Sequence, residues 1–173
     1  RIRQPSAVAS HIIEATGAAP VGMPASDTYT SLQRGVIDGL SFTWQPIQAF
    51  RLDELINTHT NIPFYNSTFV ISMNKEKYNS LPDDLKKVID DNSGAELAAH
   101  ISKVFDVSNA KAMAAAKEKG DIMIDIPDPL NDPDWRGPLM EGSQHYLDEV
   151  NATGLDADNV YEKAKAASSA CMV

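Results

Sequence analysis

The chain has 173 residues, of which 24 are acidic and 15 are basic, and its formal net charge is −9. Nucleic-acid binding requires basic surface that displaces counterions, so this charge predicts no nucleic-acid partner. The sequence contains no run of the roughly 20 apolar residues that cross a bilayer, so we expect any membrane connection to be made through partner proteins. Cys171, the single cysteine, can form no disulfide within the chain.

Short strands and capped helices are predicted to alternate through residues 1–43. After an opening strand, periodic apolar residues predict a helix over Ser6–Thr16, closed by Gly17 in the left-handed cap position. A strand over Pro20–Met23 follows, and Ser26 is the expected N-cap of the next helix. Repeated units of strand, helix and strand build open sheets that bind small ligands at the strand ends. The pattern therefore predicts an α/β fold whose architecture is that of a binding site.

The middle of the chain is predicted to contribute two strands and a helix. The turn Asp38–Gly39 leads into a strand over Leu40–Thr43. A helix from Pro46 to Ile56 is expected next, because proline suits the first turn of a helix. β-Branched and aromatic residues then predict one long strand over Phe64–Met73.

Helical spacing dominates from residue 80 onward. Ser80 opens a Ser-x-x-Asp pattern that resembles a capping box, and apolar residues then recur at helical intervals as far as Lys119. Gly94 is expected to kink or divide this helix, and Gly120 to end it. The remaining predicted elements are a strand over Asp121–Ile126, a proline-punctuated loop to Pro133, and helices around Pro138–Asn151 and Ala157–Ala167.

Six segments of the sequence match, in order, the motifs of one protein family. They are Ile2–Pro5, Gly17–Val21, Tyr29–Gly39, Phe50–Leu55, Met73–Lys75 and Ser80–Ile89. The third segment, for example, contains the pattern Tyr-x-x-Leu-Gln-x-Gly-x-x-Asp-Gly. Ordered matches over roughly half of a chain are far more specific than a single motif. The sequence therefore resembles the TRAP-type solute receptors, or DctP family, which are the extracytoplasmic binding proteins of bacterial TRAP transporters.

The resemblance implies an α/β, periplasmic-binding-protein-like fold with two lobes, a hinge-crossing strand and a long helix. What matches is the C-terminal half of longer proteins, and the sequence lacks an initiator methionine, so we expect the C-terminal portion of a larger receptor. Residues 1–62 would form the ligand-binding lobe. Residues 63–120 would form the hinge-crossing strand and the long helix returning to the other lobe. Residues 121–173 would add a strand and terminal helices that pack on the C-terminal lobe.

For function, the resemblance implies an exported, periplasmic bacterial receptor and no enzyme. Its expected ligand is a small organic acid. Its expected partners are the N-terminal half of the same receptor and the small and large TRAP membrane subunits, of the DctQ and DctM type. Closure of the two lobes around the ligand would form the surface that docks on the permease. No cofactor and no metal are expected.

Arg3 is the leading candidate for binding the acid. A guanidinium presents two parallel N–H donors that match the two oxygens of a carboxylate. In the family, the arginine at the matching motif position clamps the ligand's carboxylate, and the resemblance implies that role here. The alternative is a surface or ion-paired arginine, which is the commoner state of an Arg beside a Pro at a strand end. Arg1, two residues away on the same strand face, is not expected to take part.

The expected walls of the site come from the end of the strand after Gly39 and from the hinge. Phe42 and Trp44, with Thr43 between them, would supply apolar walls that suit a compact aliphatic or aromatic acid better than a polyhydroxylated sugar acid. Core packing is the alternative role for both rings. Tyr65 and Asn66, at the start of the predicted crossing strand, would add hydroxyl or amide contacts.

Two other classes of function remain open on the sequence. One is a small-acid enzyme with His59 or His11 as a general base, although a hydrogen-bonded structural role is the commoner state of a residue such as His59. The other is a receptor for signalling rather than uptake. His11 and Glu14 stand one helical turn apart, as metal ligands do, but no third ligand has a recognisable spacing. Four acidic residues crowd one loop without calcium-loop spacing and are expected to be solvated: Asp125, Asp128, Asp132 and Asp134.

Overall fold

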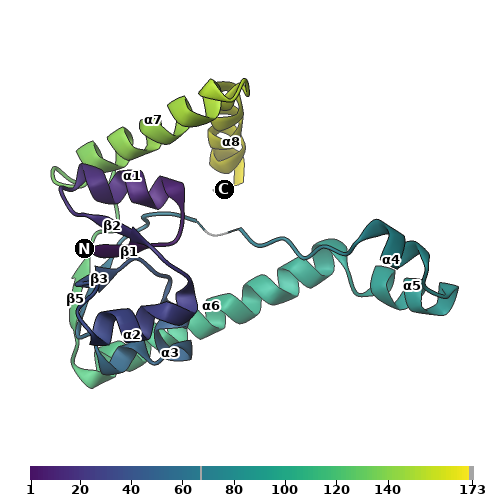
Figure 1. The fold of residues 1–173 in the computed structure, drawn as a ribbon, viewed down its shortest axis with the longest axis horizontal. Helices are drawn as coiled ribbons and strands as arrows, with labels where there is room; N and C mark the ends of the chain where they lie inside the picture. The colour runs from purple at the N-terminus through teal and green to yellow at the C-terminus, as the bar shows by residue number, and fades with distance from the viewer. Residues whose placement is uncertain (67, 172–173) are drawn as a thin grey trace.

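A computed structural model describes residues 1–66 and 68–171 of the chain as an α/β fold (Figure 1). The elements in chain order are β1 (Ile2–Gln4), α1 (Ala7–Ala15), β2 (Pro20–Gly22), the 3₁₀ helix η1 (Ala25–Asp27), α2 (Thr28–Gln33), β3 (Gly39–Leu40), α3 (Trp44–Ala49), the 3₁₀ helix η2 (Leu52–Glu54), β4 (Thr58–Asn61), α4 (Lys75–Asn79), α5 (Asp83–Asp91), α6 (Gly94–Lys119), β5 (Ile122–Asp125), α7 (Arg136–Ala152) and α8 (Ala157–Cys171).

A parallel sheet in the order β2-β1-β3 forms the centre of the N-terminal region. Arg3 lies in its middle strand, in register with Val21 of β2 and Leu40 of β3. Because the three strands are parallel, the segments that follow them leave from the same edge of the sheet. The segment after β3, Ser41–Thr43, therefore begins beside the end of the strand that carries Arg3, which is the usual place for a ligand in an open α/β sheet.

The strand predicted over Phe64–Met73 was wrong, because the strand of this region lies earlier in the chain. The described residues of Phe64–Met73 form no strand, whereas Thr58–Asn61 forms β4 and pairs in parallel with β5. An extended segment becomes a strand only where a neighbour accepts and donates its backbone hydrogen bonds. β5 supplies that neighbour to β4, and no described strand pairs with residues 64–73. Side chains of this extended segment are left exposed, at 75% for Phe69 and 83% for Val70.

Most helix ends follow the sequence prediction. Ser6 caps α1 by accepting a hydrogen bond from the backbone N–H of Ala9. The predicted helix between residues 80 and 119 is divided into α5 and α6 just before Gly94. Gly17, Gly94 and Gly120 all have positive φ, a conformation that costs glycine little because it lacks a Cβ.

Three predicted helix starts were wrong. The Ser26 hydroxyl donates to the side chain of Asp27, and the Ser80 hydroxyl donates to a backbone carbonyl of α4, so neither caps the helix after it. The helix predicted over Pro46–Ile56 begins at Trp44 and ends at Ala49. The strand before it, β3, ends at Leu40 rather than at Thr43. The side chain of Asn109 in α6 accepts a hydrogen bond of 2.7 Å from the backbone N–H of Gln45. A residue distant in sequence thus caps α3, which local patterns do not reveal.

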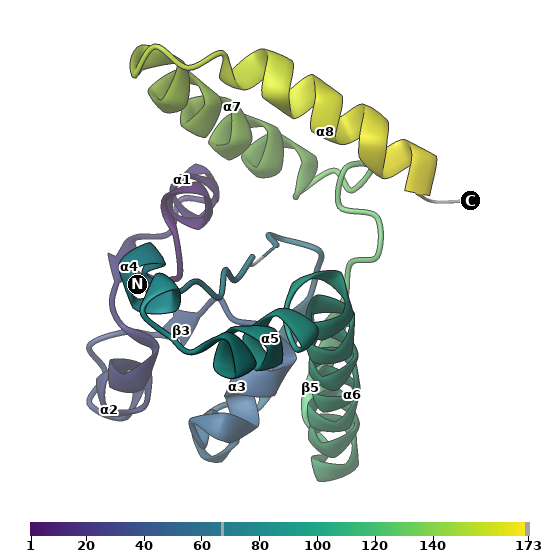
Figure 2. The ribbon, with the colours of Figure 1, turned by 90° about the vertical axis from the view of Figure 1, so that its right-hand side faces the viewer.

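The helices cover the strands from two sides (Figure 1). α1 packs against α7, and α8 packs against α7, on one side, while α3 packs against α6 on the other. α4 and α5 lie at the far end of α6, away from the strands, and Figure 2 views the molecule from that end. Within the described residues, no helix combines the length and the apolar character needed to cross a membrane. The buried apolar core consists of Ala9, Ile12, Ile13, Ile37, Ile47, Leu52, Ala112, Ala116, Leu139 and Ala157.

Candidate functional site

A cavity of about 1130 Å³ is lined by residues at both ends of the three-stranded sheet, among them Asp38 before β3 and Ser41–Thr43 after it. Its lining includes residues of β1, α1, α2 and β3, and also of the segment after β3, α3, β4, the segment that follows β4 and the loop before α7. Five aromatic side chains from these segments line it: Phe42, Trp44, Phe64, Tyr65 and Trp135. These rings can pack on the apolar body of a small ligand, and polar residues, among them Asp38 and Asp134, complete the lining.

Arg3 is buried directly behind this wall. Its side chain is one of the few buried charged groups, with the residue only 5% exposed. Nη1 donates to the carbonyl of Ser41 at 3.2 Å and Nη2 donates to the carbonyl of Met23 at 3.4 Å. Cζ lies 4.3 Å from the centre of the Phe42 ring. Arg3 does not itself line the cavity, but Ser41 and Phe42, which it contacts, do.

The Arg3 guanidinium lacks a counter-ion in the described part of the chain. No described carboxylate forms an ion pair with it, and its Nε is buried without a hydrogen-bond partner among residues 1–66 and 68–171. Burial lowers the pKa of Arg3, and the proximity of Tyr65 works in the opposite direction. An arginine nevertheless stays charged at neutral pH. A buried cation held only by two carbonyls and an aromatic ring is therefore a strong local attraction for an anion.

Trp44 is held in place by a network of polar side chains. Its Nε1 donates to Oδ1 of Asn61 at 3.2 Å, and its indole packs on the ring of His59 with centroids 4.8 Å apart. His59 is buried, and its Nε2 lies 3.0 Å from Oδ2 of Asp121. Lys119 completes the network from 3.2 Å on the other carboxylate oxygen. His59 is thus the hydrogen-bonded structural residue expected from its type, and it fixes one wall of the cavity.

The ionisation of Asp121 makes the contribution of this network to the stability of the fold depend on pH. Burial acts to raise the pKa of Asp121, but the hydrogen bonds from His59 and Lys119 outweigh it, so the pKa lies below its usual value. A carboxyl group whose pKa is lowered by folding stabilises the folded state above the unfolded pKa, near 3.9, and loses that contribution as the pH falls through the folded pKa.

We therefore expect Asp121→Asn to destabilise the protein near neutral pH and to lose that effect in acid. Measured by thermal unfolding, the difference in midpoint between the wild type and Asp121→Asn should be largest near pH 7 and should shrink below about pH 4. Asp106→Asn, at an exposed position of α6, is the control and should change the midpoint little at either pH. A difference for Asp121→Asn that stays constant from neutral pH into acid would contradict this account.

The structure brings most of the predicted site residues to one place. Phe42, Thr43, Trp44 and Tyr65 all line the cavity, and Arg3 stands behind it. Asn66 is exposed and lies outside the lining.

Arg1 is exposed and paired with a carboxylate. Its side chain forms two hydrogen bonds with the carboxylate of Asp38, and this pairing lowers the pKa of Asp38. Arg1 is therefore neutralised at the surface, whereas Arg3, two residues along the same strand, is not.

Two aromatic residues of the cavity were missed by the sequence analysis. Phe64 and Trp135 meet edge to face with ring centroids 6.2 Å apart, although they are distant in sequence. The sequence analysis placed Phe64 in a predicted strand and did not identify it as a residue of the site. Trp135 directly follows the acidic loop that ends at Asp134, and no local sequence pattern identifies it as a residue that lines a cavity.

The acidic loop has structural roles. Asp125 accepts a hydrogen bond from Asn61, and Asp132 accepts from the backbone N–H groups of Asp134 and Trp135 just before α7. Among the described side chains, none of these loop carboxylates belongs to a group with metal-ligand geometry. Asp125, Asp128 and Asp134 are exposed, as expected for a solvated loop, whereas Asp132 is half-buried.

Comparison with known proteins adds a family match. Residues 1–148 match the family of bacterial extracellular solute-binding proteins, family 7. This match covers most of the chain.

Solved structures with the same fold include TRAP solute-binding proteins from two sources. One, from Rhodoferax ferrireducens, was solved with copurified benzoate; it is 27% identical with a TM-score of 0.82 over 95% of this chain and 52% of its own. Another, from an unidentified marine microbe, is specific for aromatic acids. Its complex with 3-hydroxybenzoate is 31% identical, with a TM-score of 0.78 over the same shares of the two chains. A surface variant of the marine protein was solved with metahydroxyphenylacetate. The chain thus spans about half the length of these structures.

Proposed function

The chain belongs to the bacterial extracellular solute-binding proteins of family 7, and from this premise we propose that it forms part of a receptor for a small aromatic acid. The receptor would deliver the acid to a TRAP permease. The observation that carries the proposal is a buried arginine without a described counter-ion, placed directly behind an aromatic cavity.

In this proposal Arg3 binds the carboxylate of the ligand. Its Nη1 and Nη2 make only long hydrogen bonds to backbone carbonyls, at 3.2 and 3.4 Å, so both can be offered to a stronger acceptor. A charge-assisted pair of such bonds is shorter and stronger than bonds to neutral carbonyls. The ligand's charge would also compensate the buried cation, which would favour the bound state further.

The aromatic lining selects the body of the ligand. Five aromatic rings contribute to the lining, those of Phe42, Trp44, Phe64, Tyr65 and Trp135. Aromatic rings pack favourably on another ring in offset or edge-to-face geometry but offer few hydrogen bonds to hydroxyl groups. A benzoate-like acid therefore fits this lining better than a sugar acid. Benzoate and hydroxylated aromatic acids are the ligands recorded for the two similar proteins of known structure.

The complete receptor would bind its ligand between two lobes. We assign residues 1–62 to the ligand-binding lobe, residues 63–120 to the hinge and long helix, and residues 121–173 to the elements that pack on that lobe. The exposed apolar side chains at Phe69, Val70 and Ile71 are the surface that the N-terminal half of the receptor would cover. Ligand contacting both lobes would shift the population toward the closed form.

The closed receptor would then dock on the permease. Its site of action would be the periplasm, and its partners would be the small and large TRAP membrane subunits of the DctQ and DctM type. No chemical step is required of the chain in this scheme.

We expect the complete receptor to bind benzoate at least tenfold more tightly than glucuronate, because the five aromatic rings of the lining pack more favourably on an aromatic ring than on a sugar ring. Isothermal titration calorimetry with a panel of aromatic, aliphatic and sugar acids measures this preference. Trp44→Ala should reduce the preference for aromatic acids.

Recovery of the acid after binding separates a receptor from an enzyme. An unchanged acid is the expected result. Tighter binding of sugar acids than of aromatic acids would contradict the assigned ligand class, and conversion of the acid would contradict the receptor role itself.

A further inference from the structure

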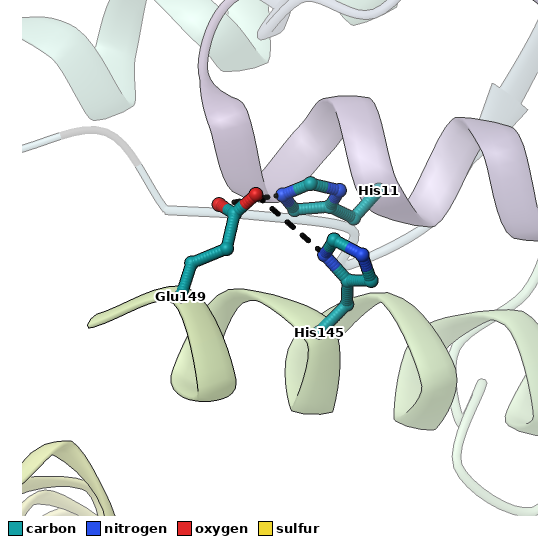
Figure 3. Close-up of side chains that lie close together, drawn as sticks. All are labelled: His11, His145 and Glu149. Carbon is teal, nitrogen blue, oxygen red and sulfur yellow. Dashed lines mark hydrogen bonds and ion pairs between the residues drawn. The ribbon is translucent and has the colours of Figure 1, made fainter. Parts of the chain in front are cut away.

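Three potential metal ligands meet on the face of the molecule where α1 packs against α7. They are His11 of α1 and His145 and Glu149 of α7 (Figure 3). Nε2 of His11 lies 3.0 Å from Oε2 of Glu149, and Nδ1 of His145 lies 3.8 Å from Oε1 of the same carboxylate. The three ligand atoms all lie within 4.8 Å of one another. Figure 3 shows the two imidazoles and the carboxylate converging from the two helices.

Packing holds the two helices in this position. His145 and Glu149 are four residues apart, so they project from the same face of α7. Gly142, one turn earlier, lies directly against the backbone of Ile12 in α1, because a Cβ at Gly142 would come within 2.6 Å of the Ile12 Cα. This close approach brings the neighbouring His11 onto the same face as the two α7 side chains.

The surroundings of the cluster are polar and leave one nitrogen unsatisfied. A small cavity of about 140 Å³ is lined by His11 and His145 together with Glu14 and Glu141. The side chain of His11 is 13% exposed, and its Nδ1 is buried without a hydrogen-bond partner in the described part of the chain. The nearest carboxylate, Glu14, is 3.9 Å from that nitrogen, which is too far for a hydrogen bond.

The imidazole rings of His11 and His145 lie with centroids 4.0 Å apart. A neutral imidazole offers one ring-nitrogen lone pair to a metal ion, so the two rings together can supply two ligand atoms. The carboxylates around them add negative charge that attracts a cation. Two imidazoles and a carboxylate within 4.8 Å of one another are thus a ligand set that suits a divalent ion.

We propose that His11, His145 and Glu149 bind a divalent cation of the zinc class. Nε2 of His11, Nδ1 of His145 and a carboxylate oxygen of Glu149 would be the protein ligands, and water would take the fourth position. Zinc holds ligand atoms at about 2.0–2.2 Å, so ligand atoms around it lie about 3.4 Å apart. The two spacings to Glu149, 3.0 and 3.8 Å, lie on either side of this value, and His145 is free to adjust because its side chain is 60% exposed.

Glu14 has a supporting position in this site. A ligating histidine commonly donates its other ring N–H to a carboxylate, which fixes the tautomer and strengthens the ligand. Nδ1 of His11 faces Glu14, so a slight movement on metal binding would satisfy the nitrogen that is otherwise buried alone. The bound ion would connect α1, which follows the strand of Arg3, to α7. This site is separate from the proposed acid site and does not depend on it.

Zinc chloride is the probe that tests the site. The protein is prepared without a histidine tag and treated with a chelator, and zinc is then added in calorimetric and thermal-unfolding titrations. We expect one ion per chain at this site and a rise in melting temperature of about 5–10 °C at a hundredfold excess over the dissociation constant. Magnesium at the same concentration should give no such rise, because it prefers oxygen ligands.

Single substitutions decide where the zinc binds. His145→Ala and Glu149→Gln change exposed side chains, so both should fold, and each should weaken binding at least tenfold. His100→Ala removes a histidine at an exposed position of α6 and should bind zinc like the wild type. Zinc binding that is equal in the wild type and in His145→Ala would overturn the proposal, and so would the absence of stoichiometric zinc binding by the wild type.

Discussion

Replacing Arg3 with alanine should lower the affinity of the complete receptor for benzoate by at least a hundredfold. Arg3 is the buried cation behind the cavity, and its neighbours Ser41 and Phe42 provide a carbonyl and a ring but no negative charge. Removing one partner of a buried ion pair costs about 3–5 kcal/mol, and each 1.4 kcal/mol is tenfold in affinity. Isothermal titration calorimetry measures the loss directly.

Two further variants make the Arg3 result specific. Arg1→Ala removes an arginine from the same strand, but one that is exposed and paired with Asp38, so its affinity for benzoate should match the wild type. Arg3→Lys keeps the charge and loses the paired donors, so we expect an affinity between those of the wild type and Arg3→Ala. Wild-type affinity in Arg3→Ala would refute the assigned role of Arg3, even if benzoate remained the best ligand of the panel.

Gly142→Ala should destabilise the protein by about 3 kcal/mol, the upper end of the usual cost of overpacking. A Cβ at this position would lie 2.5 Å from the backbone nitrogen of Ile12, and a backbone atom cannot move aside as a side chain can. The expected direction is the opposite of the ordinary effect, because glycine to alanine inside a helix stabilises by about 1 kcal/mol. Urea unfolding, read as a shift in midpoint at constant slope, gives the change in stability.

Gly137→Ala is the matched control for this experiment. Gly137 lies in the same helix, α7, and a Cβ there would meet no described atom within 4 Å. This variant should be as stable as the wild type or slightly more stable. If Gly142→Ala is no less stable than Gly137→Ala, the close packing of α7 on α1 is not what holds the two helices together.

Local chemistry explains the parts of the fold that could be predicted from the sequence. Ser6 and Gly17 bound a helix because a capping hydroxyl and a residue tolerant of positive φ act within a few residues. The division at Gly94 and the stop at Gly120 have the same local origin. The family resemblance added two expectations that local patterns do not contain: a two-lobed fold for the complete receptor, and Arg3 rather than Arg1 as the residue that binds the acid.

Contacts between residues distant in sequence determined the positions of β4 and of the start of α3. Residues 58–61 became a strand, and the more strand-like segment from Phe64 did not, because β5 pairs with the first and no described strand pairs with the second. α3 begins at Trp44 because Asn109, 64 residues from the N–H it caps, reaches back to it. Hydrogen-bond partners so distant in sequence leave no local pattern.

The same distinction holds for the sites. Residue type and motif position pointed to Arg3 and Trp44, but only the tertiary structure showed that Arg3 is buried without a described counter-ion and that Trp135 joins the aromatic wall. The sequence offered His11 and Glu14 as possible metal ligands without a recognisable third, and only folding brings His145 and Glu149, the latter 138 residues further along the chain, beside His11. Periodicity and caps act through neighbouring residues, whereas charge compensation and ligand geometry depend on which surfaces folding brings into contact.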